Sequence, residues 1–194
     1  MPQKPHHTTR ILGRRYPLTQ TWYKHVEIGI SVGPVSYVEI VLADNRGNQM
    51  PISYQTWKEL MKKRLDIEQL QWFLSSLPLR IGELDIAVVK FQDSKVVKFT
   101  CRETSLYFKF ETLSTLFNLK YCIDNMYSWL CNNTHLVNDK FKNFVNIVKQ
   151  NNVTQKSYAA QVISDSDDFN CNSLIDCELL ACALPDIMYN ALSE

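Results

Sequence analysis

Hydrophobic and polar residues alternate with two different periods along this chain. From Val26 to Val32 every second residue is apolar, which is the pattern of a half-buried strand. After a Gly-Pro break, residues 35–42 form a second β-rich stretch. Residues 44–48, Asp-Asn-Arg-Gly-Asn, predict a tight turn, because Asn and Gly tolerate positive φ. A short return strand follows at residues 50–52, so the pattern predicts a small antiparallel sheet.

The period then changes to that of a helix. Ser53 is a suitable N-cap, because its hydroxyl can accept a hydrogen bond from an unpaired backbone N–H. Apolar residues recur at three- and four-residue steps: Trp57, Leu60, Met61, Ile67, Leu70 and Leu74. This spacing predicts an amphipathic helix of about five turns that ends before Pro78.

The same order recurs in residues 79–131. Strands are predicted at residues 84–91, 96–101 and 105–110, and helical spacing begins at Leu113. A shift of 56 residues superposes the apolar positions of the two helices: Trp57 on Leu113, Leu60 on Leu116, Met61 on Phe117, Ile67 on Ile123, Leu70 on Met126 and Leu74 on Leu130. We therefore predict an α+β fold with two tandem antiparallel-sheet-plus-helix units (ββββα-like), residues 22–78 and 79–149. The two units are expected to form an intrachain pseudo-dimer, and the second one carries an extra helix near residues 137–148.

The two ends differ in charge. Residues 1–64 carry a net +6, residues 65–150 carry +1 and residues 151–194 carry −6. We expect residues 1–21 to be a basic flexible arm and residues 150–194 an acidic tail with a short C-terminal helix. The polar segment 150–172 is expected to be mobile. Such a gradient indicates two interaction surfaces or, equally, a solvated arm and a solubilising tail.

Several classes of protein are disfavoured by the sequence. No apolar run approaches the roughly 18 residues that span a bilayer, so no membrane is expected as a partner. No apolar secretory segment opens the chain, which favours a nuclear or cytoplasmic location with six reduced cysteines. Without Cys-x-x-Cys pairs, phosphate loops or hydrolase motifs, we expect no metal, no cofactor, no catalytic residues and no enzymatic activity.

Part of the first unit resembles the positive cofactor four family of single-stranded-DNA-binding transcriptional cofactors. The residues that carry the resemblance are the strand Val38-Glu39-Ile40, then Ile52-Ser53 and Trp57-x-x-Leu60. In that family a curved sheet and a long helix form one subunit and two subunits pair through their helices; the similar Whirly proteins fuse two such units. Two features differ: Gly47-Asn48-Gln49 stands in place of a long basic loop, and Leu113 in place of the second tryptophan.

This resemblance implies binding of single-stranded DNA. Single strands are held by basic side chains along the phosphates and by aromatic side chains that stack on the bases. The candidate nucleic-acid contacts are Arg10, Arg14, Arg15, Trp22, Tyr23, Lys24, Arg46, Lys90, Lys95, Lys98, Arg102 and Lys109. In the second unit they interleave with Phe91, Phe99, Tyr107 and Phe108. The alternative is that these aromatics are core residues and the lysines form the wet face of a sheet.

Two functional hypotheses follow. The first is a non-enzymatic nucleic-acid-binding protein for single-stranded or unwound DNA, with a role in transcription or replication. The second is a protein–protein adaptor that presents its acidic C-terminal helix to a partner. The anchors of that helix would be Leu174, Ile175, Leu179 and Leu180. The sequence leaves self-association into a homo-oligomer open.

Overall fold

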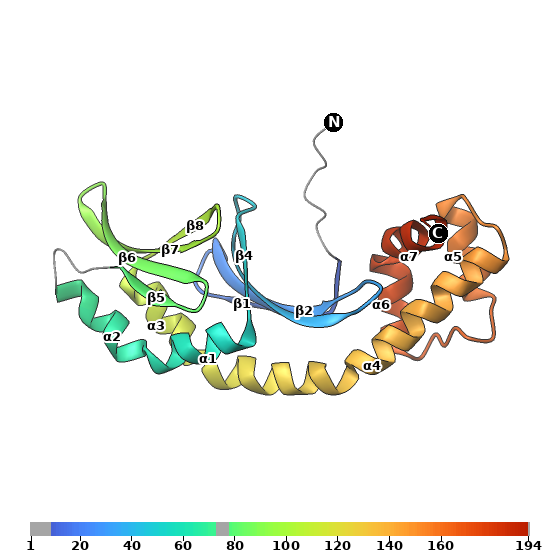
Figure 1. Cartoon of the computed structure of the whole chain (residues 1–194), viewed down its shortest axis with the longest axis horizontal. Helices are drawn as coiled ribbons and strands as arrows, with labels where there is room; N and C mark the ends of the chain where they lie inside the picture. Colours follow the sequence, from blue (N-terminus) through green and yellow to red (C-terminus); the bar gives the residue numbers. More distant parts are fainter. Residues whose placement is uncertain (1–8, 73–77, 194) are drawn as a thin grey trace. The chain divides into compact units, whose positions relative to one another are not determined.

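The computed structural model describes residues 9–72 and 78–193, and it contains two four-stranded antiparallel sheets, each followed by helices (Figure 1). The first sheet has the strand order β1-β2-β3-β4, and the second has the order β5-β6-β7-β8. This architecture confirms the predicted α+β class with two tandem sheet-plus-helix units.

Each sheet is followed directly by its helices. The first half of the chain contains β1 (Arg10–Pro17), β2 (Lys24–Ser31), β3 (Tyr37–Asp44), β4 (Gln49–Ile52), α1 (Tyr54–Lys62), α2 (Arg64–Gln69) and the 3-10 helix η1 (Leu70–Trp72). The second half contains β5 (Leu79–Ile81), β6 (Leu84–Phe91), β7 (Ser94–Cys101), β8 (Thr104–Phe108), α3 (Phe110–Asn118) and α4 (Lys120–Gln150). Three further helices complete the chain: α5 (Lys156–Ser164), α6 (Leu174–Cys182) and α7 (Leu184–Leu192).

The 56-residue repeat is visible in the helices. The shift places α1 on α3 residue for residue, and it places the break after α1 at Lys63 on the break after α3 at Leu119. Apolar positions related by the shift are buried in both copies from Trp57/Leu113 through Ile67/Ile123, whereas Leu70 and Met126 are half-buried. Leu74 lies outside the described residues. A common burial pattern over both helices supports an internal duplication of the unit.

The helices of the two repeats contact each other through a buried tryptophan. Trp57 of α1 is fully buried, and its Nε1 donates a 3.0 Å hydrogen bond to Oδ1 of Asp124 on α4. The strands β4 and β8 also lie in contact. A tryptophan indole is large and carries one donor, so it is stably buried only where an acceptor meets that donor. These contacts form the interface of the pseudo-dimer.

The prediction of a flexible arm at residues 1–21 is wrong for the part that the structure describes, residues 9–21. Residues 10–17 form β1 and pair with β2, while residues 1–8 lie outside the described residues. Ile11, Leu12 and Leu18 are buried, so this segment contributes apolar area to the core. Prolines and arginines around these three residues obscured that contribution in the sequence.

The extra helix of the second unit is not separate. α4 continues through residues 131–136 without a break. Asn and Thr in this stretch have low helix propensity. Their side chains bond back to the helix, since Asn133 Nδ2 donates to the carbonyl of Trp129 at 2.8 Å and Thr134 Oγ1 donates to that of Leu130 at 2.9 Å. Burial of Leu130 and Val137 on either side holds the helix in register.

The acidic tail is a set of packed helices and not the mobile segment with one short helix that we expected. α5 lies within the polar stretch, and its Ala159 and Ile163 are fully buried. α5, α6 and α7 contact one another. Glu178 of α6 also accepts a hydrogen bond from the backbone N–H of Leu12. A few apolar residues per helix were enough for packing, although the segment is polar on average.

By the contacts between its residues, the chain also divides into two compact units, whose bounds differ from those of the two sheet-plus-helix repeats. One contains residues 14–28 and 39–126, and the other contains the described residues up to 13 together with residues 29–38 and 127–193. No helix in the described ranges is long and apolar enough to cross a membrane.

Candidate nucleic-acid interface

The second sheet has one buried face and one accessible face. Ile86, Phe99 and Leu106 are paired across β6, β7 and β8, and all three are buried. Figure 1 shows α1, α2 and α3 running along one side of this sheet. Side chains alternate between the faces of a sheet, so the next residue on each strand points the other way. We call this other side the open face; its residues include Ala87, Val89, Phe91, Val96, Lys98 and Tyr107.

An aromatic pair dominates the open face. Phe91 at the end of β6 is 55% exposed and Tyr107 on β8 is 41% exposed. Their ring centroids are 5.9 Å apart, and the ring planes are inclined by 38°. Val96 lies on the same face of the intervening strand and is nevertheless buried, as expected if the two rings lie over it. Two large rings in contact and open to solvent can stack on planar ligands.

Lys98 places a positive charge beside this pair. It lies directly across from Tyr107, and its Nζ is 5.8 Å from the centroid of the tyrosine ring. Arg80 and Asp85 are cross-strand partners on the same side of the sheet. Arg80 Nε lies 3.9 Å from Asp85 Oδ1, so their opposite charges largely offset each other. The net charge of the open face therefore comes from Lys98, which can meet one phosphate while bases lie on the rings.

The structure does not place the other predicted lysines of this sheet on the open face. Lys90 and Lys95 are cross-strand partners one residue out of phase with the aromatic pair, so they project toward the helix side. Lys95 Nζ donates to the carbonyl of Gln71 at 3.2 Å. Lys109 is the N-cap residue of α3, and with Lys95 it lines an open hollow of about 440 Å³. These three lysines were predicted together with Lys98 but do not share its surface.

The remaining predictions in this sheet divide between turn and core. Arg102 lies in the β7–β8 turn with its guanidinium 3.9 Å from Glu83. Phe99 and Phe108 are fully buried, with ring centroids 4.9 Å apart. The alternative of a core role therefore holds for these two phenylalanines, but it does not hold for Phe91 and Tyr107.

The arginines of β1 have local partners. Arg15 forms an ion pair with Glu27 of β2, and His25 Nε2 lies 3.4 Å from the same carboxylate. Burial and then the charge of Arg15 lower the pKa of His25, against the opposing effect of Glu27. The Arg14 guanidinium lies 5.2 Å from the ring of Tyr16. Arg10 is half-buried on β1.

Of the predicted residues at the start of β2, Lys24 lies near the second sheet. Lys24 Nζ is 5.3 Å from the ring of Tyr23 and 5.1 Å from that of Phe108 on β8. Burial lowers the pKa of Lys24, although the charge of Asp44 acts in the opposite direction. Trp22 is exposed in the preceding loop with φ of +58°, and Arg46 is exposed in the β3–β4 turn. Among the predicted residues of the first sheet, Lys24 is thus in contact with β8.

The predicted partner-binding helix is partly a core element. Leu179 of α6 is fully buried, and Ile175 and Leu180 are half-buried, whereas Leu174 is exposed. The prediction of Leu179 as an exposed anchor is therefore wrong, because α6 packs against α5 and α7. The alternating acidic and apolar residues reflected a helix with a buried side.

Sequence reasoning did not include Phe91 and Tyr107 among the contact residues. Phe91 has the opposite strand parity to the apolar residues Leu84, Ile86 and Val88, which was the available signal for its exposure. Among the described residues, no cluster of three or more His, Cys, Asp or Glu could hold a metal ion. Comparisons with family models, with curated protein sequences and with solved structures found no match for this chain.

Proposed function

We propose that this protein binds single-stranded nucleic acid, DNA in preference, through the open face of the second sheet. The exposed Phe91–Tyr107 pair, with Lys98 beside it, carries the proposal. Each base that stacks on an aromatic side chain contributes about 1–3 kcal/mol. In a duplex the bases are stacked on one another, so the rings are available to unpaired bases.

The tandem arrangement supports the same proposal. Two sheet-plus-helix units that contact each other through α1 and α4 are similar to the arrangement of the positive cofactor four and Whirly families. By that resemblance we propose a role in transcription or replication, in the nucleus or the cytoplasm. The six Lys and Arg of residues 79–109 exceed the four Asp and Glu, which suits an anionic ligand.

The test is fluorescence anisotropy with a labelled oligo-dT of about 16 nucleotides across a salt series. Phe91→Ala and Tyr107→Ala should each weaken binding by about 5- to 150-fold without changing the salt slope, because stacking releases no counterions. Lys98→Ala should make the slope shallower by about 0.7, the value for one phosphate contact on a single strand.

A matched control is available on α4. Tyr121 is 71% exposed, and Lys120 Nζ lies 4.6 Å from its ring, so this pair repeats the chemistry of Tyr107 and Lys98 outside the sheet. Tyr121→Ala should leave binding unchanged. The proposal is wrong if the folded wild type binds no oligonucleotide at low salt, or if Tyr121→Ala weakens binding as much as Tyr107→Ala.

The adaptor hypothesis has less support. Of its four predicted anchors, Leu174 alone is exposed, since Leu179 is buried and the other two are half-buried. A partner that used all four would have to separate α6 from α5 and α7.

A further inference from the structure

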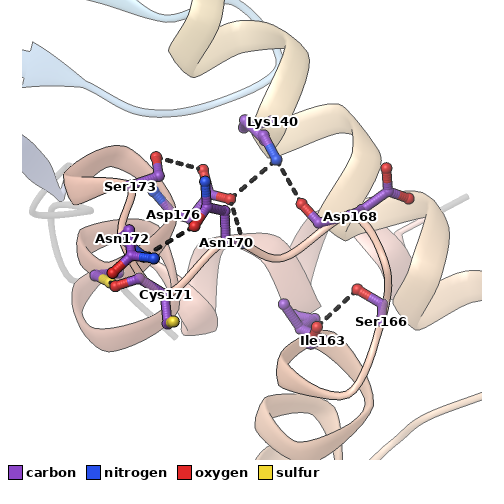
Figure 2. A network of polar contacts seen from close by, with 10 residues as sticks. Lys140, Ile163, Ser166, Asp168, Asn170, Cys171, Asn172, Ser173 and Asp176 are labelled. Carbon is purple, nitrogen blue, oxygen red and sulfur yellow. Dashed lines mark hydrogen bonds and ion pairs between the residues drawn. The ribbon is translucent and has the colours of Figure 1, made fainter.

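A buried polar network fixes the start of α6 (Figure 2). Ser173 Oγ accepts a hydrogen bond from the backbone N–H of Asp176 at 3.3 Å and donates one to Asp176 Oδ1 at 2.9 Å, which is a close relative of the capping box. Asp176 is fully buried, and its Oδ2 accepts from the backbone N–H of Asn170 and from Lys140 Nζ, both at 2.9 Å. The chain from 170 to 176 is thereby held as a closed loop.

This loop brings two cysteines together. Cys171 precedes Ser173 by two residues and is exposed, and Cys177 lies in the first turns of α6 and is partly accessible. Cys177 Sγ lies 3.3 Å from the carbonyl oxygen of Cys171. A carbonyl oxygen is about 2.4 Å from its own Cα, so the sulfur lies within about 5.7 Å of the Cα of Cys171. In a disulfide the two Cα atoms are about 4.4–6.8 Å apart, so closing this link requires rotation of both side chains and an adjustment of the loop that brings the two Cα atoms into this range.

We propose that Cys171 and Cys177 form a reversible intramolecular disulfide by exchange with a low-molecular-weight disulfide such as glutathione disulfide. The thiolate of exposed Cys171 attacks one glutathione sulfur, which forms a mixed disulfide and releases one glutathione thiolate. The thiolate of Cys177 then attacks the sulfur of Cys171 and releases the second. Two electrons pass from the two protein thiols to the glutathione disulfide, and the two protons lost by the protein end on the two released glutathione molecules.

The other cysteines are less suited to form a disulfide with a cysteine of their own element. Cys182 is five residues beyond Cys177 on α6, a rise of about 7.5 Å that exceeds the disulfide range. Cys122 and Cys131 are nine residues apart on α4, a rise of about 13.5 Å. Cys101 is buried in β7, and burial raises the pKa of its thiol, which makes it a poor nucleophile.

The disulfide would tie the loop to the first turns of α6. Its ring encloses Ser173 and Asp176, so the capping interaction and the approach of Asp176 to Lys140 could no longer open by movement of the loop alone. Amide exchange at the start of α6 should therefore be slower in the oxidised protein.

The experiment incubates the folded full-length chain in glutathione redox buffer, alkylates the remaining thiols, and maps disulfides by digestion and mass spectrometry. We expect the Cys171–Cys177 link as the main product, its loss in Cys171→Ser and Cys177→Ser, its persistence in Cys182→Ser, and its reversal by reduced glutathione. In the urea-unfolded chain, Cys177–Cys182 should form about as readily, because the two loops have similar lengths.

Two results would overturn the proposal. One is that the folded protein yields glutathione adducts without the internal link. The other is that the folded and unfolded chains give the same mixture of disulfides, since the fold would then contribute nothing to the pairing. Unchanged exchange at the start of α6 after oxidation would refute the tightening of the loop.

Discussion

Replacing Lys140 with methionine should destabilise the C-terminal helices, because it leaves the carboxylate of Asp176 buried without a counter-charge. Lys140 Nζ donates to Asp176 Oδ2 and also to the carbonyl of Asp168, so one side chain holds both α6 and the preceding loop (Figure 2). Methionine keeps the apolar stem and removes the charge and the donors.

The magnitude follows from the burial of the pair. Removing one partner of a buried ion pair costs about 3–5 kcal/mol. The side chain of Lys140 is 30% exposed, so water can replace part of its interaction, whereas Asp176 keeps its bonds from Ser173 and Asn170. We therefore expect the lower end, about 3 kcal/mol, which is roughly a 150-fold increase in the equilibrium constant for opening α6.

Native-state amide exchange of α6 measures this opening directly. Lys142→Met is the matched control, because Lys142 is exposed on the same helix. It should change the free energy of opening of α6 by less than about 0.5 kcal/mol. Adding Asp176→Leu to Lys140→Met should recover part of the loss, because no charge then stays buried. The reasoning fails if Lys140→Met lowers the free energy of opening of α6 by no more than the Lys142→Met control does.

Three further predictions concern Gly82, Trp57 and His25. Gly82→Ala should cost more than about 1 kcal/mol in urea unfolding, because Gly82 has φ of +57° and a Cβ there would lie 2.6 Å from Thr56 Oγ1; a neutral result would contradict the strain argument. Trp57→Phe should lower the unfolding free energy by about 1–3 kcal/mol through its lost bond to Asp124, and combining it with Asp124→Ala should be non-additive. Burial and a nearby guanidinium lower the pKa of His25, so its contribution to stability is present above its ordinary pKa of 6.5 and is lost as pH falls through the lower folded pKa. Thermal melts between about pH 7.5 and 5 should show a smaller loss of stability for His25→Gln than for wild type, and an equal loss would rule out this histidine as the cause.

Local chemistry in the sequence was enough to predict the repeated unit. The Asp44–Asn48 turn is closed by hydrogen bonds from the backbone N–H groups of Arg46 and Asn48 to Asp44 Oδ1, and Gly47 takes φ of +88°. Ser53 caps α1 by accepting from the Thr56 N–H at 3.0 Å. Such turns and caps involve residues within four positions of each other, so a single sequence contains the information they need. The register of the duplicated helices followed from periodicity in the same way.

The tertiary structure decided which side of an element meets solvent. Lys90, Lys95 and Lys98 read alike in the sequence, but strand pairing places Lys98 beside Tyr107 and directs the other two to the helix side. Likewise, the burial of Leu179 depends on helices that pack against α6. Side-chain parity within a strand is local, whereas the choice of buried face depends on what covers it, and that contact joins residues far apart in the chain. The sequence by itself therefore determined the elements and their repetition. The tertiary contacts determined that Phe91, Tyr107 and Lys98 form the exposed cluster, because long-range packing decides which apolar and charged groups leave water.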